Sequence, residues 1–104
     1  MSSREIISLP TTPAFERYVL ETVCRAHRWE PEAVRSTRRP IRRGGRLCGL
    51  MLQFAGPKNL KCHVIWAEAE YRLLFYDTSG KRNSEVHLAE TPDLSAWFQD
   101  RAAA

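Results

Sequence analysis

The side chains able to ligate a metal ion are three cysteines and three histidines spread along the chain. They are Cys24, His27, Cys48, Cys62, His63 and His87. None forms the paired, two-residue-spaced cysteines typical of a zinc site. Cys62 and His63 are adjacent on a predicted strand and should point to opposite faces, whereas Cys24 and His27 can share one helix face, which leaves a zinc site open as an alternative. We expect buried, reduced thiols and neither a metal nor a cofactor.

A catalytic site is the next possibility, and its candidates near one turn are Asp77, Ser79 and His87. Nucleophilic catalysis also needs an oxyanion site and a base held by a third group. The sequence contains no nucleophile elbow, phosphate-binding glycine loop or paired-carboxylate pattern. We therefore predict that the protein is not an enzyme.

The strongest chemical signal is a run of arginines. Six arginines and no acidic residue lie from Arg35 to Arg46, whereas the rest of the chain holds ten basic and twelve acidic residues. Because Pro40 and Gly44-Gly45 interrupt regular structure, we expect residues 32–45 to form an exposed, mobile loop. Such a loop suits phosphate groups, so the first hypothesis is binding of nucleic acid or another polyanion. The predicted contacts are Arg38, Arg39, Arg42, Arg43 and Arg46. The open alternatives are a solvated loop and a segment that binds an acidic partner protein.

Four predicted strands come after the arginine run, because apolar and polar residues alternate there. They are Arg46–Ala55, Leu60–Ala67, Tyr71–Thr78 and Arg82–Ala89. We expect Phe54 to face Leu60, because a slip by one residue would mix apolar and charged side chains on one face. The same argument places Trp66 opposite Tyr71. The predicted core face comprises Leu50, Leu52, Phe54, Leu60, Val64, Trp66, Tyr71, Leu73, Phe75, Val86 and Leu88.

The other face of these strands is half apolar. Its predicted interaction residues are Met51, His63, Ile65, Leu74, Tyr76 and His87. Aliphatic, aromatic and imidazole groups on one sheet face suit a partner surface or a ligand. The second hypothesis is therefore a protein-interaction or homodimerisation module that uses this face. The alternative is that a loop or the N-terminal segment covers it.

Two predicted helices flank the strands. The pair Thr12-Pro13 is a favourable cap and first residue for a helix that runs to about Arg28. The pair Thr91-Pro92 begins a short predicted helix over residues 92–101. Residues 1–11 are expected to be irregular, with a possible short strand at Glu5–Leu9.

The fold class predicted from these elements is α+β, in two layers. A four-stranded antiparallel meander packs against an N-terminal and a short C-terminal helix, in the order α-β-β-β-β-α. The length of 104 residues predicts a single domain. No apolar run approaches the ~20 residues of a membrane helix, and the N-terminal residues lack a signal-peptide core, so we expect a cytoplasmic protein with no membrane partner.

Two resemblances accompany this prediction. The order helix, strands, helix resembles the double-stranded-RNA-binding domain in outline, but the last helix of this chain begins with Thr91-Pro92-Asp93 where such domains carry lysines. The stretches Gly56–Lys61, Trp66-Ala67 and Arg72–Gly80 resemble small bacterial proteins of the planctomycete type. This second resemblance rests on turn and core residues and implies no activity.

Overall fold

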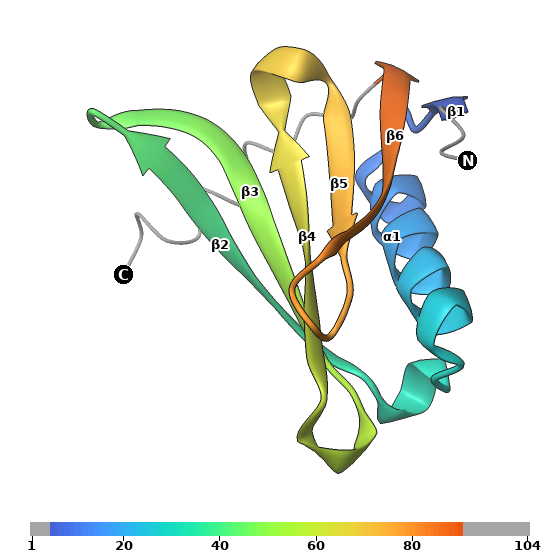
Figure 1. Cartoon of the computed structure of the whole chain (residues 1–104). Helices are drawn as coiled ribbons and strands as arrows, with labels where there is room; N and C mark the ends of the chain where they lie inside the picture. Colours follow the sequence, from blue (N-terminus) through green and yellow to red (C-terminus); the bar gives the residue numbers. More distant parts are fainter. Residues whose placement is uncertain (1–4, 91–104) are drawn as a thin grey trace.

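The computed structural model describes residues 5–90, which form one α-helix and a six-stranded sheet (Figure 1). The elements are β1 (Glu5–Ser8), α1 (Thr12–His27), β2 (Arg35–Arg43), β3 (Arg46–Ala55), β4 (Lys61–Ala67), β5 (Arg72–Tyr76) and β6 (Arg82–Glu90). The strand order in the sheet is β1-β6-β5-β4-β3-β2. Strand β1 is parallel to β6, and every other neighbouring pair is antiparallel. The predicted α+β class is confirmed, but the sheet has six strands where four were predicted.

Helix α1 has the capping that its sequence predicts, shifted by one residue. Thr11 is the N-cap, and its side-chain oxygen accepts a hydrogen bond from the Ala14 N–H at 3.2 Å. The helix ends at Arg28, which adopts the left-handed conformation with φ of 59°. The next residue, Trp29, donates its N–H to the Cys24 carbonyl at 2.9 Å, which satisfies one of the final carbonyls.

The core lies between α1 and one face of the sheet. The helix contributes Phe15, Val19, Val23 and Cys24, which recur every three or four residues. Phe15 is fully buried, and its ring meets the Trp66 ring edge-on at a centroid distance of 5.9 Å. The buried sheet residues packed with them are Leu50, Leu52, Phe54, Cys62, Val64, Trp66, Leu73, Phe75, Val86 and Leu88. The predicted core face is thus correct except at two positions.

Those two positions, Leu60 and Tyr71, are 43% and 54% exposed. The predicted register is wrong by two residues in both hairpins, because Phe54 pairs with Cys62 and Trp66 pairs with Leu73. The loops are longer than predicted: the Gly56 N–H donates to the Leu60 carbonyl at 2.8 Å, which keeps Leu60 in the turn. Tyr71 follows a short 3-10 turn and has φ of 53°. A shift of two leaves every side chain on its predicted face, since side chains alternate along a strand.

The arginine-rich segment is the largest correction. Residues 32–45 are not a loop, because β2 pairs antiparallel with β3 from Arg35 opposite Ala55 to Arg43 opposite Arg46. Gly44 and Gly45, with φ of 60° and 81°, form the two-residue connection, and consecutive positive φ values are what a tight hairpin turn requires. Strand β2 is at the edge of the sheet, where charged residues and Pro40 are tolerated.

Two further predictions concern residues 1–11 and residues 92–101. The possible short strand at Glu5–Leu9 is present as β1 (Glu5–Ser8), within the segment otherwise expected to be irregular. Leu9, which follows β1, donates its N–H to the Glu90 carbonyl at 3.1 Å. The predicted helix over residues 92–101 lies outside the described residues. Between residues 5 and 90, no helix is long and apolar enough to cross a membrane.

Replacing Trp66 with alanine tests the core. Trp66 is 3% exposed and packs against Phe15, so Trp66→Ala should lower the free energy of unfolding by about 3–5 kcal/mol. Urea denaturation followed by circular dichroism measures this. The control Ile6→Ala, at a side chain that is 70% exposed, should change stability by less than ~0.5 kcal/mol. Equal stability of Trp66→Ala and the parent would contradict the face assignment.

Candidate nucleic-acid interface

The sheet face turned away from α1, here called the outer face, is organised in rows that run across the strands. The pairing register places Met51, Ile65 and Leu74 side by side, flanked by Arg39 on β2 and Glu85 on β6. We call Met51, Ile65 and Leu74 the apolar row. Met51 and Ile65 are partly exposed, whereas Leu74 is buried among its neighbours although it faces away from the helix. The apolar row forms the centre of the outer face.

A second row consists of planar side chains. Gln53, His63, Tyr76 and Arg82 are successive cross-strand partners, and we call them the planar row. The His63 and Tyr76 rings stack with centroids 4.6 Å apart and an angle of 11° between their planes. The Arg82 guanidinium lies 5.9 Å from the Tyr76 ring centroid. Side-chain amide, imidazole, phenol and guanidinium therefore follow one another across four strands.

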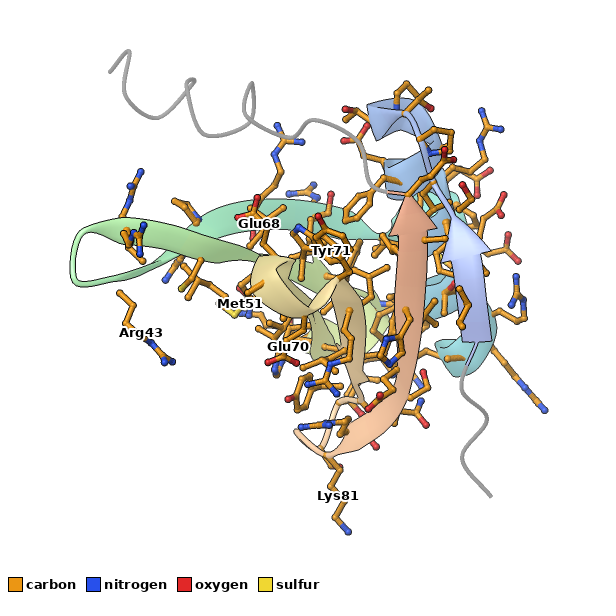
Figure 2. All side chains as sticks on the ribbon, turned by 90° about the horizontal axis from the view of Figure 1, so that it is seen from above. Arg43, Met51, Glu68, Glu70, Tyr71 and Lys81 are labelled. Atoms are coloured by element: carbon orange, nitrogen blue, oxygen red, sulfur yellow. The ribbon has the colours of Figure 1, made fainter. Side chains whose placement is uncertain are left out.

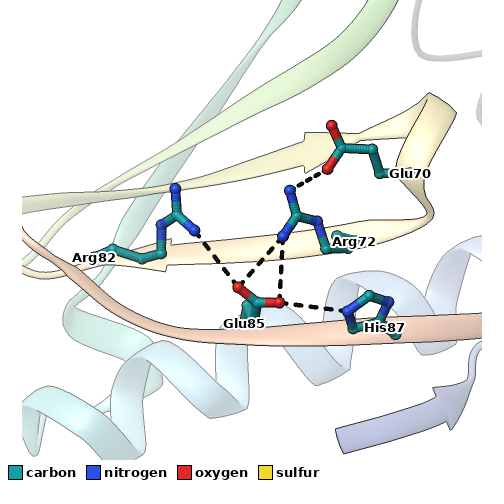
Figure 3. Close-up of polar contacts among 5 residues, drawn as sticks. All are labelled: Glu70, Arg72, Arg82, Glu85 and His87. Carbon is teal, nitrogen blue, oxygen red and sulfur yellow. Dashed lines mark hydrogen bonds and ion pairs between the residues drawn. The ribbon is translucent and has the colours of Figure 1, made fainter. Parts of the chain in front are cut away.

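On β5 and β6 the outer face carries a compact ionic cluster (Figure 3). The Glu85 carboxylate accepts hydrogen bonds from Arg72 at 3.3 and 3.4 Å and from Arg82 at 3.5 Å. His87 Nε2 lies 3.4 Å from the same carboxylate, and Arg72 also pairs with Glu70. Two arginines and two glutamates balance, so the cluster has no net charge when His87 is neutral.

The environment of Glu85 changes its acidity. Partial burial by itself would raise the pKa of Glu85, but the hydrogen bond and charge of Arg72, with a further contribution from His87, bring that pKa below its ordinary value. Glu85 therefore stays ionised in neutral solution and holds the arginines of the cluster in place.

The structure separates the five arginines predicted to contact a polyanion. Arg38 pairs across the sheet with Leu52, on the side of α1, and its guanidinium is 3.2 Å from the Glu16 carboxylate. Arg39 is on the outer face beside Met51. The other three, Arg42, Arg43 and Arg46, lie around the β2–β3 turn. None of these four remaining arginines has an ion-pair partner among residues 5–90.

Two further cations, Arg35 and Lys61, lie on the outer face, and neither is among the predicted contacts. Arg35 pairs with Ala55, and Ala55 pairs with Lys61, so the two cations lie on either side of Ala55. Neither has an ion-pair partner within the described part of the chain. In Figure 2, Arg43 extends away from the β2–β3 hairpin at the left of the view and Lys81 extends away from the sheet at the bottom, with Met51 and Glu70 between them. The available sequence signal is the alternation of side chains along a strand. Once residues 35–43 are recognised as a strand, Arg35 and Arg39 fall on the same face.

A groove opens on the opposite side of the sheet, between α1 and the β2 edge. It has a volume of about 440 Å³, and its lining includes Phe15, Leu52 and Phe54. The ion pair between Arg38 and Glu16 belongs to the same lining. Arg38 is therefore part of this groove, whereas Arg39 lies on the outer face of the sheet.

The predicted interaction residues lie together. Cross-strand pairing places all six on the outer face: Met51, His63, Ile65, Leu74, Tyr76 and His87. The catalytic candidates are not brought together, because Asp77 follows the end of β5, whereas His87 pairs with Arg72 at its beginning. Asp77 closes its own turn, accepting hydrogen bonds from the Ser79 N–H at 2.9 Å and the Ser79 hydroxyl at 2.7 Å. These bonds lower the pKa of Asp77.

Cys24, Cys48 and Cys62 form no disulfide; Cys24 and Cys62 are buried, and Cys48 is partly exposed. Burial, with smaller effects from Cys24 and Asp77, raises the pKa of Cys62 to about 11. Burial also raises the pKa of Cys24, helped by Glu30 and Glu32. Neutral thiols are poor metal ligands and poor nucleophiles. Over residues 5–90, no group of three or more His, Cys, Asp or Glu side chains is placed to hold a metal ion.

Comparison with known proteins gives no relative. No protein-family model matches the chain, and no curated protein sequence or solved structure matches it. Function must therefore be argued from the charges, rings and apolar groups of the outer face.

The ionic cluster predicts a pH dependence of stability. A carboxyl group with a lowered pKa in the folded state adds stability above its unfolded pKa, and that stability is lost as the pH falls through the folded pKa. Glu85→Gln should therefore melt below the parent at pH 7, and the gap should close as the pH falls below about 4. Thermal melts across this range measure it.

The control is Glu21→Gln on the exposed side of α1, where the structure gives the carboxylate no ion pair within residues 5–90. The difference in melting temperature between Glu21→Gln and the parent should not change with pH. A difference in melting temperature between Glu85→Gln and the parent that stays constant from neutral to acidic pH would mean that the carboxylate charge is not what holds the cluster.

Proposed function

We propose that this protein binds a polyanion, and nucleic acid first among polyanions, through exposed arginines of β2 and the β2–β3 turn. The observation that carries the proposal is the state of Arg39, Arg42, Arg43 and Arg46. All four are exposed, and none has an ion-pair partner in the part of the chain that the structure describes. Cations without protein partners are free to neutralise phosphates and release counterions.

Pairing of β2 with β3 supports the proposal further. A strand fixes the spacing of its side chains, so Arg35 and Arg39, four residues apart, stand about 13 Å from one another on the outer face. Arginine presents a planar donor fork that matches phosphate geometry. Guanidinium groups displayed on a strand lose less conformational entropy on binding than groups on a mobile loop.

The same arrangement protects the β2 edge against pairing with another strand. An edge strand exposes unpaired backbone groups, and charged side chains and proline are the usual protection against edge-to-edge pairing. Strand β2 has five arginines and Pro40. The arginines thus serve solubility as well as ligand binding, and they disfavour a homodimer formed through this edge.

The second candidate function is protein interaction through the outer face. The apolar row supports it, because Met51 and Ile65 are partly exposed at the centre of a sheet face. Salt distinguishes the two candidates: phosphate binding weakens steeply with added salt, whereas apolar association does not. Light scattering after size exclusion at low and high salt measures self-association, and a dimer that persists at high salt would favour this second candidate.

The main test removes three arginines. The variant Arg39→Gln, Arg42→Gln and Arg43→Gln should lose its retention on heparin and should weaken binding to a mixed pool of DNA and RNA. The slope of log affinity against log salt should fall by roughly two to three, because each phosphate contact contributes about 0.7–0.9. The melting temperature should stay within a few degrees of the parent, since exposed charges contribute little to folding.

A matched control removes the same charge elsewhere. The variant Arg17→Gln, Arg25→Gln and Arg28→Gln changes three exposed arginines in and just after α1. It should keep most of the heparin retention and the parental salt slope. If both variants lose binding equally, net charge alone is responsible and the proposed surface is wrong.

A further inference from the structure

We infer that the outer face takes unpaired nucleobases, so that the polyanion bound is single-stranded nucleic acid. This inference rests on the proposed polyanion binding and adds the class of ligand. It begins from the combination of the planar row, the apolar row and cations along one border of both rows. Charge alone would fit any polyanion, but ring edges beside aliphatic side chains add a surface that can contact the flat, apolar faces of bases.

The dimensions of this surface follow from sheet geometry. Adjacent strands are about 4.8 Å apart, so the planar row extends about 14 Å from Gln53 to Arg82. The apolar row lies two residues away along the strands, a distance of about 7 Å. The two rows form one platform on which the flat side of a base can lie.

The polar groups of the platform are available to a ligand. The Gln53 amide, the His63 ring nitrogens and the Tyr76 hydroxyl make no hydrogen bond to another side chain or to the backbone of residues 5–90. All three residues are partly exposed. The faces of the Tyr76 ring are occupied by His63 and Arg82, so a base meets the ring edges and not the ring faces. Base edges carry both donors and acceptors, so the polar groups can pair with them, while the apolar row and the ring edges contact the base faces.

The charges on the two sides of the platform indicate on which side the sugar–phosphate backbone of a bound nucleic acid lies. On the β2 border, Arg39 extends the apolar row, and Arg35 lies near the end of the planar row. On the opposite side, Arg72 of β5 and Arg82 of β6 are already paired with Glu85. The sugar–phosphate backbone should therefore follow β2, with the bases directed across β3, β4 and β5.

A duplex fits this surface poorly. Its bases are paired and stacked on one another, so a flat sheet reaches only its phosphates. Unpaired bases instead expose their faces, and every base has an apolar face that can lie on ring edges and aliphatic side chains, so such contact is tolerant of sequence. The preference for single strands is what separates this inference from polyanion binding in general.

The experiment compares three fluorescent probes by anisotropy at low salt. They are an oligothymidylate of about twelve nucleotides, an abasic sugar–phosphate strand of equal length and a duplex of equal length. The parent should bind the oligothymidylate at least about fivefold tighter than the abasic strand. Tyr76→Ala should remove most of that preference and leave abasic binding unchanged, and Tyr76→Phe should keep it.

Tyr71→Ala is the matched control, because Tyr71 is a more exposed tyrosine that stacks on Trp66, a residue of the core face. It should keep the preference for the oligothymidylate. Comparison of the parent on the three probes needs no variant, so it decides the question even if Tyr76→Ala does not fold.

The outcomes separate the two proposals. Equal parental affinity for the oligothymidylate and the abasic strand, or tighter binding of the duplex, would overturn the base platform and leave polyanion binding standing. Absence of binding to every probe at low salt would overturn both. A parental preference for the oligothymidylate that Tyr76→Ala removes and Tyr71→Ala retains is the supporting result.

Discussion

Packing of α1 against one face of the sheet is the interaction on which the rest of the structure depends. The helix buries Phe15, Val19 and Val23 against the even-numbered side chains of β3 and β4. Because side chains alternate, burial of one set leaves the other set on the outer face without a second layer among the described elements. The helix therefore decides which residues belong to the core and which remain available for binding.

Strand β2 carries a different constraint, since it pairs on one side and is open on the other. Pairing with β3 fixes its backbone, and the open edge tolerates a sequence too charged for any interior position. Figure 1 shows the β2–β3 hairpin reaching to the opposite side of the view from α1. An element that contributes little to the core can hold many exposed arginines at low cost in folding free energy, and this favours the placement of a binding function there.

The face of the sheet on which each side chain lies was predictable from the sequence, whereas the pairing register of the strands was not. The alternation from Leu50 to Trp66 identifies the core face, but a shift of two residues preserves that alternation, so Cys62 rather than Leu60 lies opposite Phe54. The turn decides between the two registers, and its positive φ values at Lys58 and Asn59 have no clear sequence signal. Strand β2 was missed because six arginines suggest solvent, although Gly44-Gly45 between two extended segments is a hairpin signal. The rings of His63 and Tyr76 could be placed on one face from the sequence, whereas their direct contact follows only from the true register.

The distribution of charge on the outer face follows from the same register. Arg72 and Arg82 lie within reach of Glu85 because β5 and β6 pair as they do, and their charges are used within the protein. Arg35 and Arg39 have no acidic cross-strand neighbour, because β3 offers them only Ala55 and Met51. Among residues 5–90, the charges on β5 and β6 are therefore internally neutralised, whereas those of Arg35 and Arg39 on the β2 edge are not. Such an asymmetry does not stabilise the isolated fold, since exposed like charges along one strand repel one another. The proposed anionic ligand would supply a counter-charge along this border.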